Sequence, residues 1–193
     1  MTKLSTRDSK LRRFRFFSIV IATIGFFAPA NAALGQATQR DIDAFAKSKL
    51  VYIATVRKDG NQSKSTPVWF TTTADHLLCI ETGPATWKAK RIRRGSPAMI
   101  WIGAEDGPAF IGKAEITNDP AIRNRIVTDY PEKYLSARVG LFRPSEEKFA
   151  AGKIVAIKIT PIRDLPDGFT NQAGTPAPGL DSAASSTPST APH

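Results

Sequence analysis

The sequence predicts a mainly β fold, a small antiparallel barrel with flanking helices. Six segments carry the β-branched runs or the alternation of apolar and polar residues that are typical of strands. These segments are residues 50–57, 64–73, 76–81, 98–103, 110–117 and 153–160. Tight-turn signals lie between strands at Asp59-Gly60 and at residues 105–108. Hairpin turns of this kind favour an antiparallel barrel over a parallel sheet.

Helical patterns fill most of the remaining segments. Thr38 can cap a helix over residues 38–49, and residues 84–94 form a basic helical segment that Gly95 ends. Asp119-Pro120 predicts the start of a helix by its cap and first-turn proline. We expect Pro131 to end this helix and a further helix to follow over residues 131–141. A last helical turn is expected over residues 145–152.

Composition limits the number of domains and the class of partner. The 193 residues are 41% hydrophobic and 23% charged, which suits one domain of about 100–150 residues with extensions. The first 35 residues hold six of the 27 Lys and Arg and one acidic residue, so half of the net charge of +10 belongs to them. We therefore attribute much of the basicity to targeting and expect no nucleic-acid partner. Because the chain has one Cys and two His, we expect neither an internal disulfide nor a Cys/His metal site.

Both ends of the chain differ in composition from the predicted domain, residues 38–169. Residues 1–32 resemble a secretory signal peptide, with a basic start, an apolar core over residues 16–28 and small residues at Ala30-Asn31-Ala32. This core is shorter than the about 20 residues that span a membrane, so we expect cleavage rather than a retained anchor. The protein would then be exported, to a bacterial periplasm, and would meet the membrane only during export. Residues 170–193 are rich in Pro, Ser, Thr and Ala and predict a disordered tail.

The basic segment Lys88–Arg94 carries five cations in seven positions. A solvated helix face is the simplest interpretation, but neighbouring residues favour an anion site. Thr82 and Thr86 place hydroxyls near the start of the segment. Lys88 and Arg91 are three positions apart and share a helix face, while residues 68–70 offer apolar surface for a planar ring. A phosphate beside a supported ring is the chemistry of a flavin mononucleotide (FMN) site, and the short basic segment argues against a nucleic-acid surface.

The sequence identifies no candidate catalytic residue. It contains no Gly-x-Ser-x-Gly elbow, phosphate loop or dinucleotide fingerprint. We interpret the carboxylate pairs Glu105-Asp106 and Glu146-Glu147 as solvated turn and helix-cap residues. Cys79 lies within a predicted strand and is expected in the core, and His76 is expected at the surface.

The ordered set of strand and turn motifs resembles the pyridoxamine-phosphate-oxidase-like FMN-binding split barrels. The resemblance is greatest to the branch of flavin- and deazaflavin-dependent oxidoreductases, and it covers roughly residues 41–165. The motifs that carry it are Ile53–Gly60, Ser65–Phe70, Thr82-Gly83-Pro84 with Lys88 and Arg91, Phe142–Ser145 and Lys153–Ile157. The resemblance implies a six-stranded antiparallel split barrel that forms a homodimer, with two cofactor sites at the subunit interface.

The resemblance also implies residue roles. Thr66, Pro67 and Val68 would line the flavin ring and its ribityl chain. The phosphate would be held by Thr82, Thr86 and Lys88, with Trp87 and Arg91 beside it, and Lys90 could reach a longer anionic tail. The implied function is an FMN-binding oxidoreductase of unknown substrate; the alternative is a non-enzymatic flavin, haem or deazaflavin binding protein. The deazaflavin coenzyme F-420 and haem are the alternative cofactors, with His76 the one axial ligand available within the domain.

Overall fold

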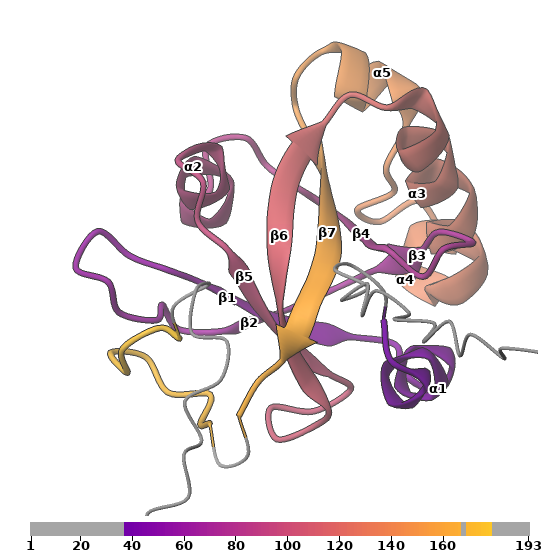
Figure 1. The fold of residues 1–193 in the computed structure, drawn as a ribbon. Coiled ribbons are helices and arrows are strands. Elements are labelled where there is room, and N and C mark those ends of the chain that lie inside the picture. The colour runs from indigo at the N-terminus through magenta and orange to yellow at the C-terminus, as the bar shows by residue number, and fades with distance from the viewer. Residues whose placement is uncertain (1–36, 167–168, 179–193) are drawn as a thin grey trace, which may run out of the picture. The chain divides into compact units, whose positions relative to one another are not determined.

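The structure is a computed structural model that describes residues 37–166 and 169–178, so the predicted signal segment lies outside the described residues. Within this part, one curled antiparallel sheet holds seven strands in the order β2-β1-β5-β6-β7-β4-β3 (Figure 1). The strands are β1 (Val51–Thr55), β2 (Thr66–Val68), β3 (Thr71–Thr72), β4 (Leu78–Thr82), β5 (Ala98–Ile102), β6 (Ala109–Thr117) and β7 (Val155–Asp164). The mainly β antiparallel fold predicted from the sequence is confirmed.

The barrel closes through one interrupted segment. The two edge strands of the sheet, β2 and β3, are consecutive in the chain and are separated only by Trp69 and Phe70. The prediction of one continuous strand over residues 64–73 was therefore wrong, and the described sheet has seven strands instead of six. The interruption lets one segment pair with β1 at one edge and with β4 at the other. Pro67 lies in β2, an edge strand, as its missing N–H predicts.

Two tyrosine hydroxyls replace the strand hydrogen bonds at the interruption. The Tyr134 hydroxyl accepts a hydrogen bond from the Phe70 N–H and donates one to the Phe70 carbonyl, both at 2.9 Å. The Tyr130 hydroxyl donates to the Trp69 carbonyl at 2.9 Å. The Trp69 and Tyr134 rings are stacked with centroids 4.6 Å apart. These bonds satisfy buried backbone groups that would otherwise destabilise the fold.

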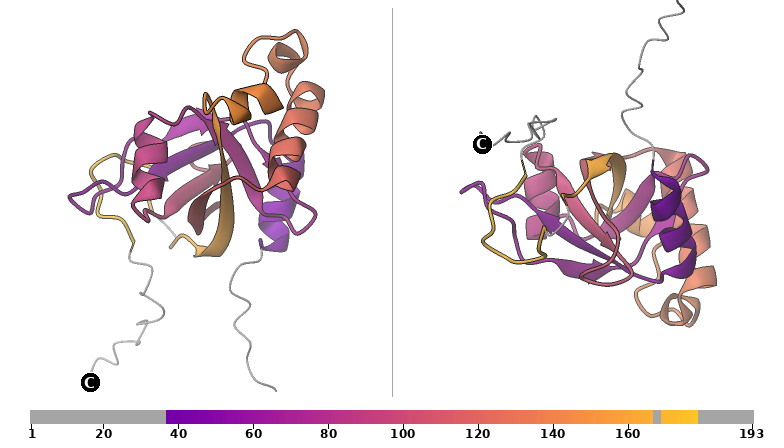
Figure 2. Two further views of the ribbon diagram at one scale, coloured as in Figure 1. Left: turned by 90° about the horizontal axis from the view of Figure 1, so that it is seen from above. Right: turned by 60° about the horizontal axis from the view of Figure 1, so that its bottom comes forward.

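Five helices flank the described sheet, and α2 lies away from α3 and α5, across β6 and β7 (Figure 2). The helices are α1 (Gln39–Lys47), α2 (Trp87–Arg93), α3 (Pro120–Lys133), α4 (Leu135–Arg138) and α5 (Glu146–Ala150). Thr38 caps α1 in a reciprocal capping box with Asp41, and Asp119 caps α3. None of these helices is long and apolar enough to cross a membrane, within the residues that the structure describes.

Pro131 does not end α3, contrary to the sequence prediction. The helix continues two residues further to Lys133, and the Tyr134 N–H donates to the Tyr130 carbonyl at 2.8 Å to close its last turn. The missing N–H of Pro131 removes one helical bond, while the burial of Tyr130 and Tyr134 holds the segment in place. The further helix expected over residues 131–141 is reduced to the four residues of α4.

The core has a barrel interior and a second cluster beneath α3 and α5. Alternate residues of the strands fill the interior, including Ile53, Leu78, Ile100 and Ile157. The second cluster is formed by Cys79, Ile122, Ile126, Tyr130, Tyr134, Ala137, Phe149 and Ala156. Burial raises the pKa of the Cys79 thiol to about 12, which fits the prediction of a core thiol.

The described residues after β7 contact the rest of the domain. Residues 169–178 pass along the loop between β1 and β2, where Asn61 forms an isolated bridge with Pro176. The Phe169 ring stacks on Trp101 with centroids 6.4 Å apart. The prediction of a disordered tail remains a prediction for residues 179–193, which lie outside the described residues.

Gly112 provides a test of the packing between β6 and β7. It follows a register shift in the ladder, where a Cβ atom would lie 2.7 Å from Ile159 Cγ2 and 2.9 Å from the Thr160 carbonyl oxygen. We expect Gly112→Ala to lower the free energy of unfolding by about 1–3 kcal/mol, as overpacking does. Urea unfolding measures this loss. The control is Gly83→Ala, whose Cβ would meet only Thr86 Cγ2, at 3.6 Å; equal losses would contradict the steric argument.

Candidate functional site

A pocket of about 390 Å³ lies between α2 and the β1–β2 loop, which consists of residues 56–65. It is lined by Ile53, Thr55, Arg57, Ser63, Lys64, Thr66, Thr82, Thr86, Trp87, Lys88 and Arg91. We call it the cationic pocket. Six of the eight site residues predicted from the sequence belong to it: Thr66, Thr82, Thr86, Trp87, Lys88 and Arg91. The structure thus brings together segments that are up to 38 positions apart in the chain.

The other two predicted residues, Pro67 and Val68, line a neighbouring pocket of about 420 Å³. This second pocket is mostly apolar and also contains Leu50, Trp69, Glu81 and Phe142. Pro67 directly follows Thr66 of the cationic pocket, and Glu81 directly precedes Thr82. The two pockets are therefore neighbours along both β2 and β4, one cationic and one apolar.

Local sequence signals place α2 beside the barrel. Thr86 is the N-cap, and its hydroxyl accepts a hydrogen bond from the Ala89 N–H at 3.3 Å and donates to the Gly83 carbonyl at 2.8 Å. Ala89 and Ile92 are buried and anchor the helix. Gly95 follows with φ +84° and allows the chain to turn away, as the sequence predicts. This anchoring leaves Lys88 and Arg91 on the face that lines the cationic pocket.

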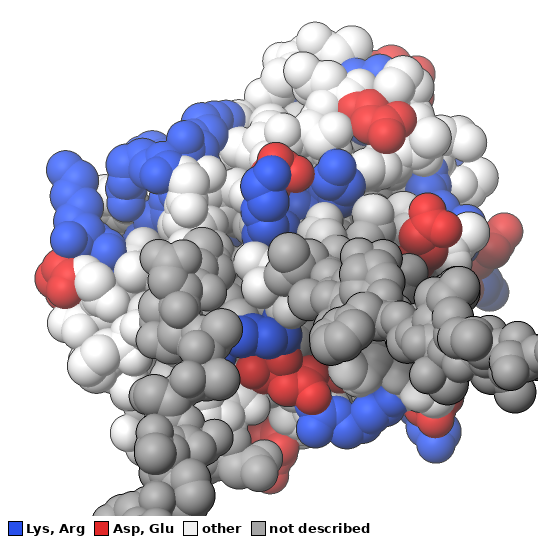
Figure 3. All heavy atoms as spheres, viewed as in Figure 1, with Lys and Arg blue, Asp and Glu red and all other residues white. Residues whose placement is uncertain are grey.

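Four cations line the pocket and no carboxylate does. Arg57 and Lys64 come from the β1–β2 loop, and Lys88 and Arg91 come from α2. Figure 3 shows Lys and Arg side chains gathered over these two elements. The Arg91 Nη1 donates to the Thr55 hydroxyl at 3.3 Å. Burial and then the neighbouring Arg57 and Arg94 charges lower the pKa of Arg91, a sign that like charges are crowded here.

The sequence did not nominate Arg57 and Lys64. Arg57 could have been found from its spacing, because Ile53, Thr55 and Arg57 alternate in the segment predicted as a strand over residues 50–57. In the structure all three residues line the pocket. The Nε atom of Arg57 is buried and has no hydrogen-bond partner, although its Nη2 lies 3.4 Å from an Asp59 carboxylate oxygen. A buried donor without a partner is costly, and Arg57 as a residue lines the cationic pocket.

Lys88 carries the most perturbed charge of the cationic pocket. Burial lowers the pKa of its ammonium group to about 8, and the nearby Glu81 carboxylate opposes part of this shift. Burial also raises the pKa of Glu81. An anion bound in the pocket would favour the charged form of Lys88, and the loss of that charge would weaken the anion's binding.

Trp87 forms an exposed platform at the edge of the pocket. It is 67% exposed, with Lys90 Nζ 5.0 Å and Arg91 Cζ 5.7 Å from its ring centroid. These are cation–π distances. Lys90, for which the family resemblance implied contact with a longer anionic tail, lies over this ring and is not among the residues that line the pocket. The donors that do line it, four cations and several hydroxyls, match the oxygens of a phosphate group.

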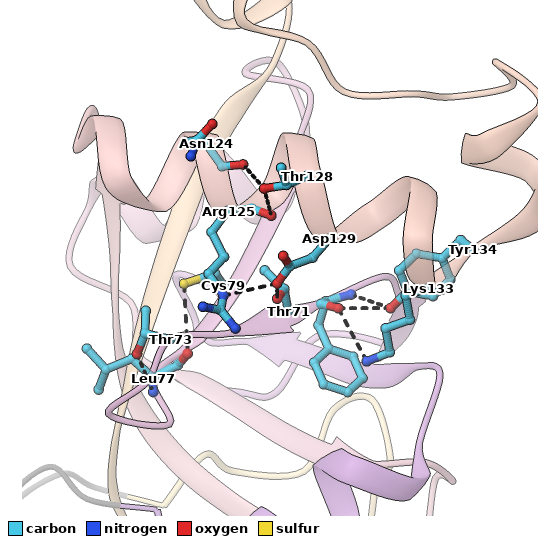
Figure 4. A network of polar contacts seen from close by, with 11 residues as sticks. Thr71, Thr73, Leu77, Cys79, Asn124, Arg125, Thr128, Asp129, Lys133 and Tyr134 are labelled. Carbon is cyan, nitrogen blue, oxygen red and sulfur yellow. Dashed lines mark hydrogen bonds and ion pairs between the residues drawn. The ribbon is translucent and has the colours of Figure 1, made fainter.

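The other titratable residues that the sequence analysis considered lie outside the cationic pocket. His76 is exposed at the turn between β3 and β4, and Glu105 and Asp106 are exposed in the loop after β5. Arg125 bonds Asp129, which accepts from the Thr71 hydroxyl, and this network ties α3 to β3 (Figure 4). No group of three His, Cys, Asp or Glu that could hold a metal occurs among the described residues.

The family model described as pyridoxamine 5'-phosphate oxidase matches residues 38–165. The chain therefore belongs to this family, and its curled antiparallel sheet is that of a split barrel. The resemblance inferred from the strand and turn motifs is confirmed. No curated protein matches the sequence significantly.

Several solved structures are similar to the described domain. A Listeria innocua protein, for which a pyridoxamine 5'-phosphate oxidase activity has been suggested, is 20% identical over 65% of this chain and 94% of its own, with a TM-score of 0.48. A conserved hypothetical protein from Mycobacterium tuberculosis is 24% identical over 68% of this chain and 85% of its own, with a TM-score of 0.48. General stress protein 26 from Bacillus anthracis is 21% identical over 62% of this chain and 84% of its own, with a TM-score of 0.46.

Proposed function

We propose that this protein binds FMN through its phosphate and acts as a flavin-dependent oxidoreductase. The observation that carries the proposal is the composition of the cationic pocket, in which four cations and the hydroxyls of Thr66, Thr82 and Thr86 converge without a carboxylate. Charge-assisted hydrogen bonds to phosphate are the strongest polar contacts available to such a group. Membership of the pyridoxamine 5'-phosphate oxidase family supports the proposal independently of this geometry.

Each part of the ligand has a matching surface. Lys88, Arg91 and Arg57 would bind the phosphate oxygens, and the apolar pocket beside Pro67 and Val68 would support the ring. When bound, the flavin would supply hydride or electron transfer, and the protein would supply its binding and orientation. The chain's own contribution is to desolvate the phosphate and hold the ring against an apolar surface.

Mass spectrometry of the small molecule that co-purifies with the protein tests the identity of the ligand. We expect FMN and the visible absorption of an oxidised flavin. If coenzyme F-420 is found instead, the assignment of the phosphate site would stand and the proposed redox partner would change. Haem would contradict the assignment, since the exposed His76 does not line either pocket. Colourless protein that also fails to bind added FMN would refute the proposal.

Turnover of the bound flavin distinguishes an oxidoreductase from a protein that only binds the cofactor. Anaerobic reduction of the bound flavin by NAD(P)H or a dye donor, followed by reoxidation with an acceptor, is expected for an oxidoreductase. A flavin that stays oxidised with every donor would favour a carrier that binds the cofactor without turnover.

We expect FMN affinity to depend on pH in both directions. The FMN phosphate reaches its dianionic form above about pH 6. Lys88 has a pKa of about 8 in the free protein, so it loses its charge as the pH rises through this value. Affinity should therefore be greatest between about pH 6 and 8 and fall by about tenfold over the next two pH units. Titration of flavin fluorescence at each pH measures this profile.

Lys88→Arg is the matched variant for the alkaline half of the profile. Arginine stays charged throughout this range, so the variant should retain its affinity above about pH 8. An alkaline loss that persists in Lys88→Arg would assign the dependence to another group.

The proposal extends to a homodimer that is exported. Four large hydrophobic side chains of α4 and the residues that follow it are between 59% and 80% exposed, namely Leu135, Val139, Leu141 and Phe142. A second subunit that covers Phe142 would also cover Pro67 and Val68, because all three residues line the same pocket. Light scattering should give a dimer mass, and sequencing of the mature protein should give an N-terminus near Ala33.

A further inference from the structure

The described residues after β7 contact the loop that carries two of the pocket's four cations. The β1–β2 loop supplies Arg57 and Lys64 to the cationic pocket. In Figures 1 and 2 the yellow segment near the C-terminus runs beside this loop. Three backbone hydrogen bonds join them: Gln62 N–H to Thr175 O at 2.7 Å, Gly174 N–H to Gln62 O at 2.9 Å and Ala177 N–H to Gly60 O at 3.1 Å. We call residues 171–177 the C-terminal strap.

Gln62 shows how closely the strap covers the loop. Its exposed fraction is 0%, although it lies in a loop at the edge of the sheet. Both of its backbone groups bond to the strap, and its side-chain amide donates to Asn171 Oδ1 at 3.4 Å. An isolated hairpin of this kind has little stability of its own. Contacts from outside the hairpin therefore contribute to holding it in one conformation.

The strap also lies near the guanidinium that faces the pocket. A Cβ atom on Gly174 would lie 4.0 Å from Arg57 Nη2. The loop's own bonds, such as Arg57 N–H to Asn61 O at 2.8 Å, fix the backbone of Arg57 relative to residues that the strap holds. The strap therefore contacts the loop that carries Arg57 and does not line the pocket itself.

We propose that the C-terminal strap is a positioning element of the cationic pocket, which holds the β1–β2 loop so that Arg57 can bind the phosphate of the ligand. The inference rests on the proposed binding of FMN. It gives the chain beyond β7 a role in ligand affinity that the family match, which ends at residue 165, does not cover.

Two proline substitutions at adjacent positions of the full chain test this role. Gly174→Pro removes the N–H that bonds to Gln62, and proline cannot adopt the φ of +93° found at this position. Ala173→Pro is the control. The Thr175 N–H donates to the Gln172 carbonyl at 3.3 Å across a turn in which Ala173 comes first and Gly174 second. Proline is common at the first central position of a turn whose second residue has positive φ.

We expect Gly174→Pro to weaken FMN binding by about tenfold, because it disturbs the one charge-assisted contact between Arg57 and the phosphate. Ala173→Pro should leave FMN binding unchanged. Thermal unfolding of both variants should stay within a few degrees of the unaltered chain. In an Arg57→Gln background, Gly174→Pro should have no further effect on FMN affinity. A full additional loss in that background would show that the strap does not act through Arg57 and would overturn the proposal.

Hydrogen exchange separates a failure of this inference from a failure of the FMN assignment. Exchange of the Gln62 and Arg57 amides needs no ligand, and both should exchange faster in Gly174→Pro than in Ala173→Pro. Unchanged exchange would overturn the strap even if FMN binds. Absence of FMN binding by the unaltered chain, with faster exchange in Gly174→Pro, would refute the proposed function and leave the strap's hold on the loop established.

Discussion

Lys88→Ala is expected to raise the dissociation constant for FMN by about tenfold to about a hundredfold, since a charge-assisted hydrogen bond contributes about 1.5–3 kcal/mol. Lys88 lies half-buried in the cationic pocket, where burial has already lowered its pKa to about 8. Removing the ammonium group leaves the phosphate with fewer donors in a poorly solvated site. Quenching of flavin fluorescence on titration at pH 7 measures the change.

The matched control for this variant is Lys58→Ala. Lys58 is an exposed cation of the β1–β2 loop that does not line the pocket, so it tests the general attraction of a basic surface for an anion. We expect its effect to be within a factor of about two, because exposed charges are screened. Equal losses from the two variants would show that the phosphate binds elsewhere.

Tyr134→Phe is expected to produce a large loss of stability, a lowering of the free energy of unfolding by about 1–3 kcal/mol. The Tyr134 hydroxyl bonds both backbone groups of Phe70 at the point where the barrel closes. Without it the buried Phe70 N–H has no partner, whereas the Phe70 carbonyl keeps a contact with Lys133 Nζ at 3.4 Å. Urea unfolding followed by circular dichroism measures the loss.

Tyr52→Phe is the control for the chemical change itself. The Tyr52 hydroxyl makes no hydrogen bond within the residues that the structure describes, and its removal should change stability by less than about 0.5 kcal/mol. We expect Tyr134→Phe to cost at least as much as Tyr130→Phe, which removes one bond to the Trp69 carbonyl. A neutral Tyr134→Phe would mean that the interruption between β2 and β3 is held by packing alone.

Local signals predicted much of the fold because they act within a few residues. Thr38, Asp119 and Ser145 each cap a helix through bonds to backbone N–H groups two or three residues on, so the sequence shows both partners. The alternation in residues 50–57 and 153–160 located β1 and the first part of β7, which continues four residues beyond the prediction to Asp164. The same locality explains why Thr82, Thr86, Lys88 and Arg91 could be grouped, since all lie within ten residues of one another.

Long-range contacts account for what the sequence did not predict. The break at Trp69 and Phe70 depends on tyrosine hydroxyls about 60 positions away. The continuation of α3 through Pro131 depends on the same pairs, because Tyr130 and Tyr134 are buried against Trp69. Arg57 and Lys64 join the pocket only when the β1–β2 loop packs beside α2. The contacts of residues 171–177 with that loop could not be read from a composition typical of disorder.

The most direct test of the phosphate assignment compares FMN with riboflavin, which carries the same ring without the phosphate. Isothermal titration of the purified chain with each at pH 7 measures the difference. The cationic pocket predicts that FMN binds at least about a hundredfold more tightly, from two or more charge-assisted bonds. Equal affinities for the two flavins, or no binding of either, would contradict it.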